Sequence, residues 1–200
     1  MSKKIKKSFG TPIIGGKYKG KQIEIPSVTT TRSSKSILRE SLFNTLQFDI
    51  VNQNFVEVFA GSGSIALEAI SRGAKRAWCI EKDKSVYNIL QSNIDKIAPN
   101  MIIAINGDSF ELFENIKTQA TADSSKAYFY FDPPFSIREG MDNIYENTLK
   151  LIESIKPNEA VMVIIEHMSQ YDLPSQIGSM QLKKSKKFGK SKLSYYEPVE

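Results

Sequence analysis

The 200-residue chain is poor in the residues that build disulfides and metal sites, with one cysteine, Cys79, and one histidine, His167. A single cysteine excludes an internal disulfide and is typical of proteins from a reducing compartment. One cysteine and one histidine are also too few ligands for a typical zinc site, so we expect no metal in this protein.

Long hydrophobic runs and internal repeats are missing as well. No apolar segment approaches the length that crosses a bilayer, and the first residues, "MSKKIKKS", place no apolar stretch after their lysines. The sequence therefore predicts neither a membrane span nor a signal peptide, and we expect a cytoplasmic protein with no membrane partner. Its length fits a single domain over residues 1–200 with a core of ordinary size.

The formal net charge of +5 is modest, but the lysines are unevenly placed. They cluster at residues 3–7, 17–21 and 183–192, with Tyr18 and Phe188 among them. Such clusters are typical of a surface that follows the phosphates of a nucleic acid. A solvated lysine-rich face would give the same pattern, so charge alone leaves both interpretations open.

Two elements are expected before the main part of the chain. The stretch "TPIIGGKYKGKQIEIP" predicts two short strands around a glycine-rich turn, a basic β-hairpin over residues 10–26. A helix is expected over residues 33–48, with Ser33 or Ser34 at its amino end. The apolar face of this helix is predicted to contain Ile37, Leu38, Ser41, Leu42 and Leu46.

The rest of the chain, residues 54–200, alternates strand-like and helical patterns. Strands are expected at 54–59, 77–81, 101–106, 127–132 and 160–167, and helical segments at 63–73, 84–97, 109–117 and 140–155 with a polar loop at 118–126. This alternation predicts an α/β domain with a mostly parallel sheet covered on both faces. Residues 180–189 and 192–198 fit an antiparallel pair of strands at the edge of that sheet.

The stretch "EVFAGSGSIALEA" runs from a strand into a glycine-rich turn that opens a helix. Gly61 and Gly63 let the backbone come close to a ligand, and the first N–H groups of the helix are available to it. Glu81, at the end of the next strand, is placed to accept both hydroxyls of a ribose. Asp108, after the third strand, is available to an adenine amino group. Gly61, Gly63 and Ala66 also satisfy a dinucleotide fingerprint, but the three strand ends together favour an adenosine-type pocket.

The fourth strand ends in "FDPPF" at the same edge of the sheet. Pro133 and Pro134 fix φ and carry no N–H, so they form a stiff turn that can direct carbonyls toward a ligand. An exocyclic amino group of a base is a poor nucleophile because its lone pair is delocalised into the ring. If Asp132 and the Pro133 carbonyl accept its hydrogens, the lone pair is turned toward the methyl group of S-adenosylmethionine. Phe135 can then stack on a base taken out of its helix or loop, which makes Asp132, Pro133, Pro134 and Phe135 the predicted catalytic residues.

Several stretches together resemble one family. "FAGSG" followed by "DPPF" is similar to amino-methyltransferases that act on exocyclic nitrogens of bases. "IIGGKYKGKQIEIP", "RESLFNTL", "EVFAGSGSIALEAISRGA", "GDSF" and "FGKSKLSYY" extend the resemblance, in order, over nearly the whole chain to the RsmD family of bacterial 16S ribosomal RNA guanine-N2 methyltransferases. The resemblance implies a Rossmann-like class I fold with a mostly parallel seven-stranded sheet, S-adenosylmethionine as cofactor, and 16S ribosomal RNA in an assembled or nearly assembled small subunit as partner.

The resemblance also assigns residues to roles. It implies cofactor contacts at Phe59, Ala60, Gly61, Ser62, Gly63, Glu81, Asp108 and Ser109. It implies RNA contacts at Lys17, Tyr18, Lys19, Lys21, Arg32, Lys186, Lys187 and Lys190. The chain departs from the family at Ser33, Ser34, Ser36 and Ile37, where the family prefers proline, threonine, aspartate and arginine, and at Glu57, where an aspartate is usual.

Four other classes of protein share some of these sequence features. An N6-adenine DNA or RNA methyltransferase would share the chemistry and stays the alternative. Against the DNA enzyme, about seventy residues separate Gly61 from Asp132 and leave no room for a target-recognition domain, and the small hairpin suits a structured RNA better. Methylation at carbon 5 of a pyrimidine is excluded because it needs a cysteine nucleophile, and Cys79 lies within a strand pattern. A nicotinamide oxidoreductase gives no account of "DPPF", and His167 fits a strand end better than a catalyst. A non-catalytic RNA-binding protein would have no need of these glycines and acids together.

Overall fold

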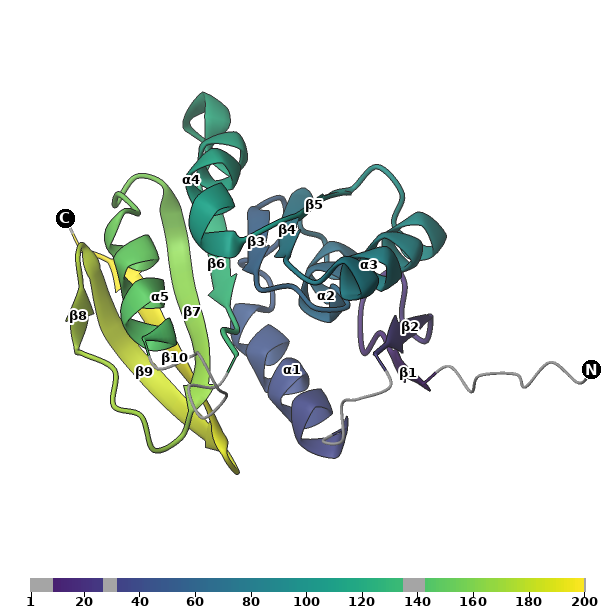
Figure 1. Cartoon of the computed structure of the whole chain (residues 1–200), viewed down its shortest axis with the longest axis horizontal. Helices are drawn as coiled ribbons and strands as arrows, with labels where there is room; N and C mark the ends of the chain where they lie inside the picture. The colour runs from purple at the N-terminus through teal and green to yellow at the C-terminus, as the bar shows by residue number, and fades with distance from the viewer. Residues whose placement is uncertain (1–8, 27–31, 135–142, 200) are drawn as a thin grey trace, which may run out of the picture.

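The computed structural model describes residues 9–26, 32–134 and 143–199, without the side chains of Phe9 and of residues 32–34 (Figure 1). Several expectations therefore lie outside the described residues: the first lysine cluster at 3–7, the side chains of Arg32, Ser33 and Ser34, Phe135, and the first residues of the helix expected at 140–155. No helix within the described ranges is long and apolar enough to cross a membrane.

Within the described residues, the main sheet has eight strands in the order β5-β4-β3-β6-β7-β10-β9-β8. The strands are β3 (Asn54–Val58), β4 (Arg76–Glu81), β5 (Ile102–Asn106), β6 (Ala127–Phe131), β7 (Ala160–Met168), β8 (Gln176–Ile177), β9 (Met180–Phe188) and β10 (Ser191–Pro198). The pairs from β5 to β7 are parallel, and those that join β7, β10, β9 and β8 are antiparallel. The expected fold is confirmed, and the two-residue β8 adds an eighth strand to the seven predicted.

Helices cover both faces of this sheet, because each central strand buries side chains on both sides. On one face lie α1 (Arg32–Leu46), α2 (Ser64–Ser71) and α3 (Lys84–Ile97), and on the other α4 (Ser109–Ala120) and α5 (Ile144–Glu153). Along β3, Phe55 packs with the first group, whereas Val56 and Val58 pack with the second. This three-layer arrangement is the expected one.

The expected hairpin is present as a separate two-stranded sheet of β1 (Phe9–Pro12) and β2 (Gln22–Ile25). The strands are antiparallel, with Pro12 opposite Gln22 next to the turn and Phe9 opposite Ile25 at the open end. Figure 1 shows the hairpin beside α2 and α3, at the opposite end of the molecule from β8 and β9.

The predicted face of α1 is wrong in part. Leu38, Leu42 and Leu46 are buried as expected, but Ile37 is 59% exposed. Positions 38, 42 and 46 form an i, i+4 row, and Ile37 lies one residue back from it on the solvent side. The helix also ends at Leu46 rather than at residue 48, and Phe48 is 84% exposed.

The predicted loop at 118–126 is wrong at its start. The helical segment expected at 109–117 continues as α4 to Ala120, and Thr121 caps it with an N–H that donates to the Lys117 carbonyl. The buried row of Phe113 and Ile116 continues to Ala120, beyond the predicted end, and packs this last turn against the sheet. A short 3-10 helix, Ala122–Ser124, then leads into β6.

Candidate active site

The strand order reverses direction between β3 and β6. From β3 the chain proceeds to β4 and β5 on one side, and then β6 pairs with the other side of β3. Open α/β sheets bind ligands outside the carboxyl ends of the strands at such a point. A cavity of about 510 Å³ lies there, lined among others by the open end of the hairpin, α1, the Phe59–Ser62 turn, Asp132 and Glu166.

The glycine-rich turn is held by Glu81, the last residue of β4. The Gly61 N–H donates to Glu81 Oε2 at 2.8 Å, and the Asp83 N–H donates to Glu81 Oε1 at 2.7 Å. Burial raises the pKa of Glu81, against the lowering effect of these N–H donors. Gly61 has φ +54, and a Cβ at this position would meet nothing within 4 Å, so the turn faces open space. The structure thus brings Gly61 and Glu81 together, with the carboxylate fixing the turn.

Gly63 has a conformational and a packing role that the sequence did not indicate. A Cβ on Gly63 would lie 2.3 Å from the Leu90 Cδ1 of α3, so the glycine permits helix α2 to pack closely on α3. Its φ of +75 adds a conformational reason for the same residue. Gly63 therefore allows the turn its left-handed conformation and allows α2 to lie close to Leu90.

Asp108 is the N-cap of α4, where its Oδ1 accepts the Phe110 N–H at 2.9 Å. Its Oδ2 accepts from Lys82 Nζ at 2.7 Å, and this contact lowers the pKa of the Asp108 carboxyl. Both oxygens are thus engaged, and Ser109 behind them is buried. Phe110, which sequence reasoning missed, meets the ring of Phe59 edge-on with centroids 5.6 Å apart. These two rings form an apolar wall between the ends of β3 and β5.

The sequence marked Glu57 only as a replacement for aspartate. In the structure it lies in β3, and its side chain reaches the amino end of α2. Its side chain is 3% exposed, and Oε2 accepts the Ala66 N–H at 2.9 Å. Burial raises the pKa of Glu57 to about 8, although hydrogen bonds from the start of α2 act in the opposite direction. The expectation that the first helix N–H groups are all available to a ligand is therefore wrong for Ala66.

Asp132 lies beside the cavity with a group of residues that sequence reasoning did not connect to it. Lys35 Nζ of α1 contacts Asp132 Oδ2 at 2.9 Å and Glu166 Oε1 at 3.6 Å. Tyr130 donates its hydroxyl to Glu166 Oε2 at 2.7 Å. Pro133 is buried and Pro134 is half-buried directly after Asp132. The only sequence signal for Glu166 was an acid at the end of the apolar run "VMVIIE".

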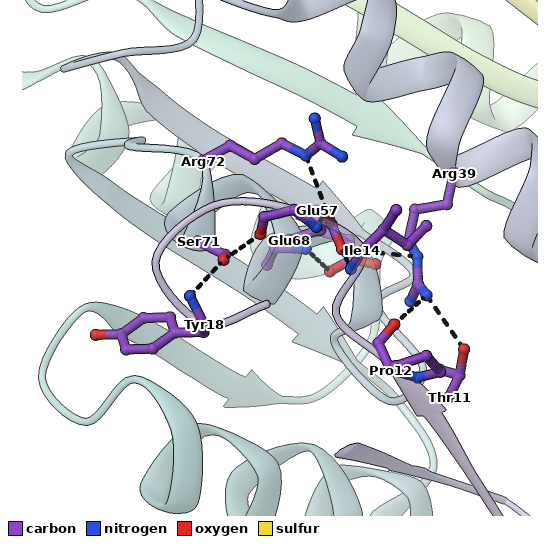
Figure 2. Close-up of polar contacts among 11 residues, drawn as sticks. Thr11, Pro12, Ile14, Tyr18, Arg39, Glu57, Glu68, Ser71 and Arg72 are labelled. Atoms are coloured by element: carbon purple, nitrogen blue, oxygen red, sulfur yellow. Dashed lines mark hydrogen bonds and ion pairs between the residues drawn. The ribbon is translucent and has the colours of Figure 1, made fainter. Parts of the chain in front are cut away.

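The hairpin is attached to this site through the buried carboxylate of Glu68 (Figure 2). Glu68 accepts the N–H groups of Ile14 and Gly15 at 2.8 and 2.9 Å, and Nε of Arg72 at 2.8 Å. Arg39 of α1 donates to the Pro12 carbonyl at 2.7 Å, and its Nε lies 3.9 Å from Glu68. Two arginines and one glutamate therefore fix the hairpin on α2, so that residues 10–12 line the cavity.

The basic residues predicted to bind RNA lie in two places. In the hairpin turn, Lys17 and Lys21 flank the ring of Tyr18, and Lys19 is exposed. This turn lies against the carboxyl end of α2, where the Lys17 N–H donates to the Ser71 carbonyl, and so away from the cavity. Lys186, Lys187 and Lys190 lie near the turn between β9 and β10. Ser191, which follows that turn, pairs with Met168 at the edge of the sheet that carries Asp132.

The single histidine and the single cysteine are both buried away from the cavity. His167 is fully buried, with Nε2 2.9 Å from the Ser194 hydroxyl, and burial lowers its pKa to about 4. Cys79 is buried with its Sγ 3.9 Å from Glu57 Oε2, and burial raises the pKa of its thiol. Neither side chain lines the cavity.

The strand order, the glycine turn and the acids at the strand ends define a Rossmann-like protein of the class I methyltransferase type. The family model named conserved hypothetical protein 95 matches residues 11–197. The chain belongs to this family, that of the RsmD proteins, as the sequence motifs indicated.

Individual relatives agree with this assignment. The Escherichia coli protein named ribosomal RNA small subunit methyltransferase D is 29% identical over 187 residues, which cover 92% of this chain and 88% of that protein. The protein of the same name from Haemophilus influenzae is 30% identical and covers 77% of this chain and 78% of its own length. Among solved structures, the YhhF protein of Escherichia coli superposes with a TM-score of 0.75 at 27% identity, covering 95% of this chain and 98% of that chain.

Proposed function

We propose that this protein transfers a methyl group from S-adenosylmethionine to the exocyclic N2 of a guanine in 16S ribosomal RNA of the small subunit. The observation that carries the proposal is the position of Asp132 and its two prolines. They follow β6 at the point where the sheet reverses direction, beside a cavity that also includes the Phe59–Ser62 turn. The names of the relatives support ribosomal RNA as the substrate class.

The residues around the glycine turn suit an adenosine-type cofactor. Open space at Gly61, the apolar rings of Phe59 and Phe110, and the acid Glu81 would accommodate a nucleoside with its ribose hydroxyls. Glu81 would exchange one of its N–H contacts for a ribose hydroxyl, and Asp108 would have to share or release Lys82 to reach an adenine. The bound cofactor would supply an electrophilic methyl group on a sulfonium and would leave as the neutral thioether.

The chain's own contribution to transfer is orientation and charge. Asp132 and the Pro133 carbonyl accept the hydrogens of the amino group, which fixes the nitrogen and turns its lone pair toward the methyl carbon. As the N–C bond forms, the nitrogen becomes positive, and the Asp132 carboxylate stabilises that charge. The nitrogen then loses one proton toward Asp132 and solvent, which restores the neutral amine.

The proposal is tested on ribosomal RNA from cells that lack this gene. Digestion to nucleosides and mass spectrometry should show one N2-methylguanine lost from 16S RNA relative to the parent strain. The purified protein with S-adenosylmethionine should restore it on small subunits from the deletion strain. A lost N6-methyladenine would instead support the adenine alternative, and an unchanged nucleoside profile would refute ribosomal RNA as the substrate.

A further inference from the structure

Glu166 is a buried acid that lies directly beside Asp132. Its strand, β7, pairs with β6 in parallel, with Ile165 opposite Phe131, so that Glu166 and Asp132 follow at equivalent positions. Both side chains line the cavity, although Glu166 is only 1% exposed. Tyr130 fixes Glu166 through Oε2, and Oε1 has no hydrogen-bond partner among the residues that the structure describes.

Among the residues that the structure describes, the ammonium of Lys35 is the cation that contacts both carboxylates. Lys35 Nζ is 2.9 Å from Asp132 Oδ2 and 3.6 Å from Glu166 Oε1. The Lys35 side chain is 54% exposed and extends from the first turn of α1, so it can withdraw into solvent without disturbing the core. The Lys35 ammonium therefore marks a position where Asp132 and Glu166 can both accept hydrogen bonds from one group.

The two acceptors match one edge of one base. Guanine presents two neighbouring donors on its Watson–Crick edge, the N1–H and the N2 amino group. Adenine presents its amino group beside N1, which is an acceptor and would face the Glu166 oxygen with like polarity. Because Asp132 and Glu166 follow the last pair between β6 and β7 and line one cavity, a base with its amino group on Asp132 can turn its N1 side toward Oε1 of Glu166.

We propose that Glu166 is a specificity-determining residue of the methyl-transfer site, which accepts the N1–H of guanine while Asp132 accepts a hydrogen of N2. This inference rests on the proposed function and names the group that selects the base. Glu166 is 1% exposed, and the cation that faces its Oε1 is the solvent-exposed Lys35 at 3.6 Å, which an entering base can replace. A buried carboxylate is costly unless such a donor faces it. The Tyr130 hydroxyl holds the carboxylate so that Oε1 remains directed at the ligand side.

The test pairs a change in the protein with a change in the base. Small subunits are reconstituted with guanine or 2-aminopurine at the methylated nucleotide, because 2-aminopurine keeps the amino group but has an acceptor at N1. In single-turnover transfer, the unaltered protein should favour guanine by about ten- to a hundredfold, the scale of one specific base contact. In Glu166→Gln the amide can donate to the N1 of 2-aminopurine, so transfer to guanine should fall and the ratio should approach one.

Two further variants make the result decisive. Glu146→Gln, at an exposed position of α5, should keep the parental ratio. Glu166→Asp keeps the charge but withdraws it by one methylene, and it should lower the ratio even if Glu166→Gln fails to fold. If the Glu166 variants slow both substrates equally, Glu166 is structural and the inference is overturned. If the unaltered protein does not methylate guanine in unmodified subunits, the proposed function itself fails, which is seen before any variant is made.

Discussion

At the scale of single residues, the proposed mechanism assigns to Asp132 the charge that stabilises methyl transfer. Asp132→Asn keeps the shape and one acceptor but loses the charge that offsets the positive nitrogen. Single-turnover methyl transfer to small subunits should fall by about two to three powers of ten, the scale of one preorganised electrostatic contact. The affinity for S-adenosylhomocysteine, measured by calorimetry, should stay nearly unchanged. The matched control is Asp123→Asn at an exposed position, and near-parental rates in Asp132→Asn would assign this turn a structural role only.

Glu57 gives the molecule a pH dependence of stability that can be isolated. Its pKa is raised to about 8 in the folded protein, above its ordinary value of 4.5, so between these values the folded state holds a proton that the unfolded state has lost. The free energy of unfolding should therefore fall as pH rises through this window. Glu57→Gln removes the titration, and its stability relative to the parent should increase by up to about 1.4 kcal/mol per pH unit. Denaturant unfolding from pH 5 to 8 checks this, and parallel curves for the two proteins would contradict it.

At the scale of elements, the buried carboxylate of Glu68 is one of the groups that attach the hairpin, together with Arg39, Ser71 and Asn93. Glu68 is fully buried and accepts from two hairpin amides and from Arg72. Glu68→Gln leaves the neighbouring arginines without their counter-charge. The free energy of unfolding should therefore fall by roughly 3 kcal/mol. Hydrogen exchange at the Ile14 and Gly15 amides should accelerate more than exchange in the central strands. Glu146→Gln serves as the exposed control, and unchanged protection of these amides would mean that the contacts from Arg39, Ser71 and Asn93 hold the hairpin without Glu68.

Elements with local sequence signals were predictable, whereas contacts between distant parts of the chain were not. The strands, the glycine turn and "DPPF" were predictable because alternation and turn chemistry are local signals. The Lys35 contact to Asp132 joins residues 97 positions apart, and no local pattern reports such a pair. Ile37 was misplaced because helical spacing defines apolar rows but not which row meets the sheet. The end of α4 was missed because packing of Ala120 against the sheet, rather than propensity, extends the helix.

At the scale of the whole molecule, positive charge lies at two separate places relative to the cavity. The lysines near the β9–β10 turn are at the edge of the sheet that carries Asp132, and Lys186 also contacts Ser41 and Thr45 of α1 at 3.4 Å. The hairpin lysines lie at the carboxyl end of α2. This helix of eight residues is about 12 Å long, and its amino end follows the glycine turn beside the cavity. A small subunit is large enough to cover both surfaces, so their contributions can be measured separately.

Replacement of Lys186, Lys187 and Lys190 by alanine should weaken binding to small subunits while the affinity for S-adenosylhomocysteine stays the same. If each lysine neutralises one phosphate, the slope of log affinity against log salt should become shallower by about 2 to 3. The matched variant changes Lys17, Lys19 and Lys21, and a similar loss there would extend the RNA surface along α2 to the hairpin turn. Titrations at several salt concentrations provide the slopes. An unchanged slope in the first triple variant would mean that these lysines form a solvated face, and that the RNA reaches Asp132 over the hairpin side of the cavity.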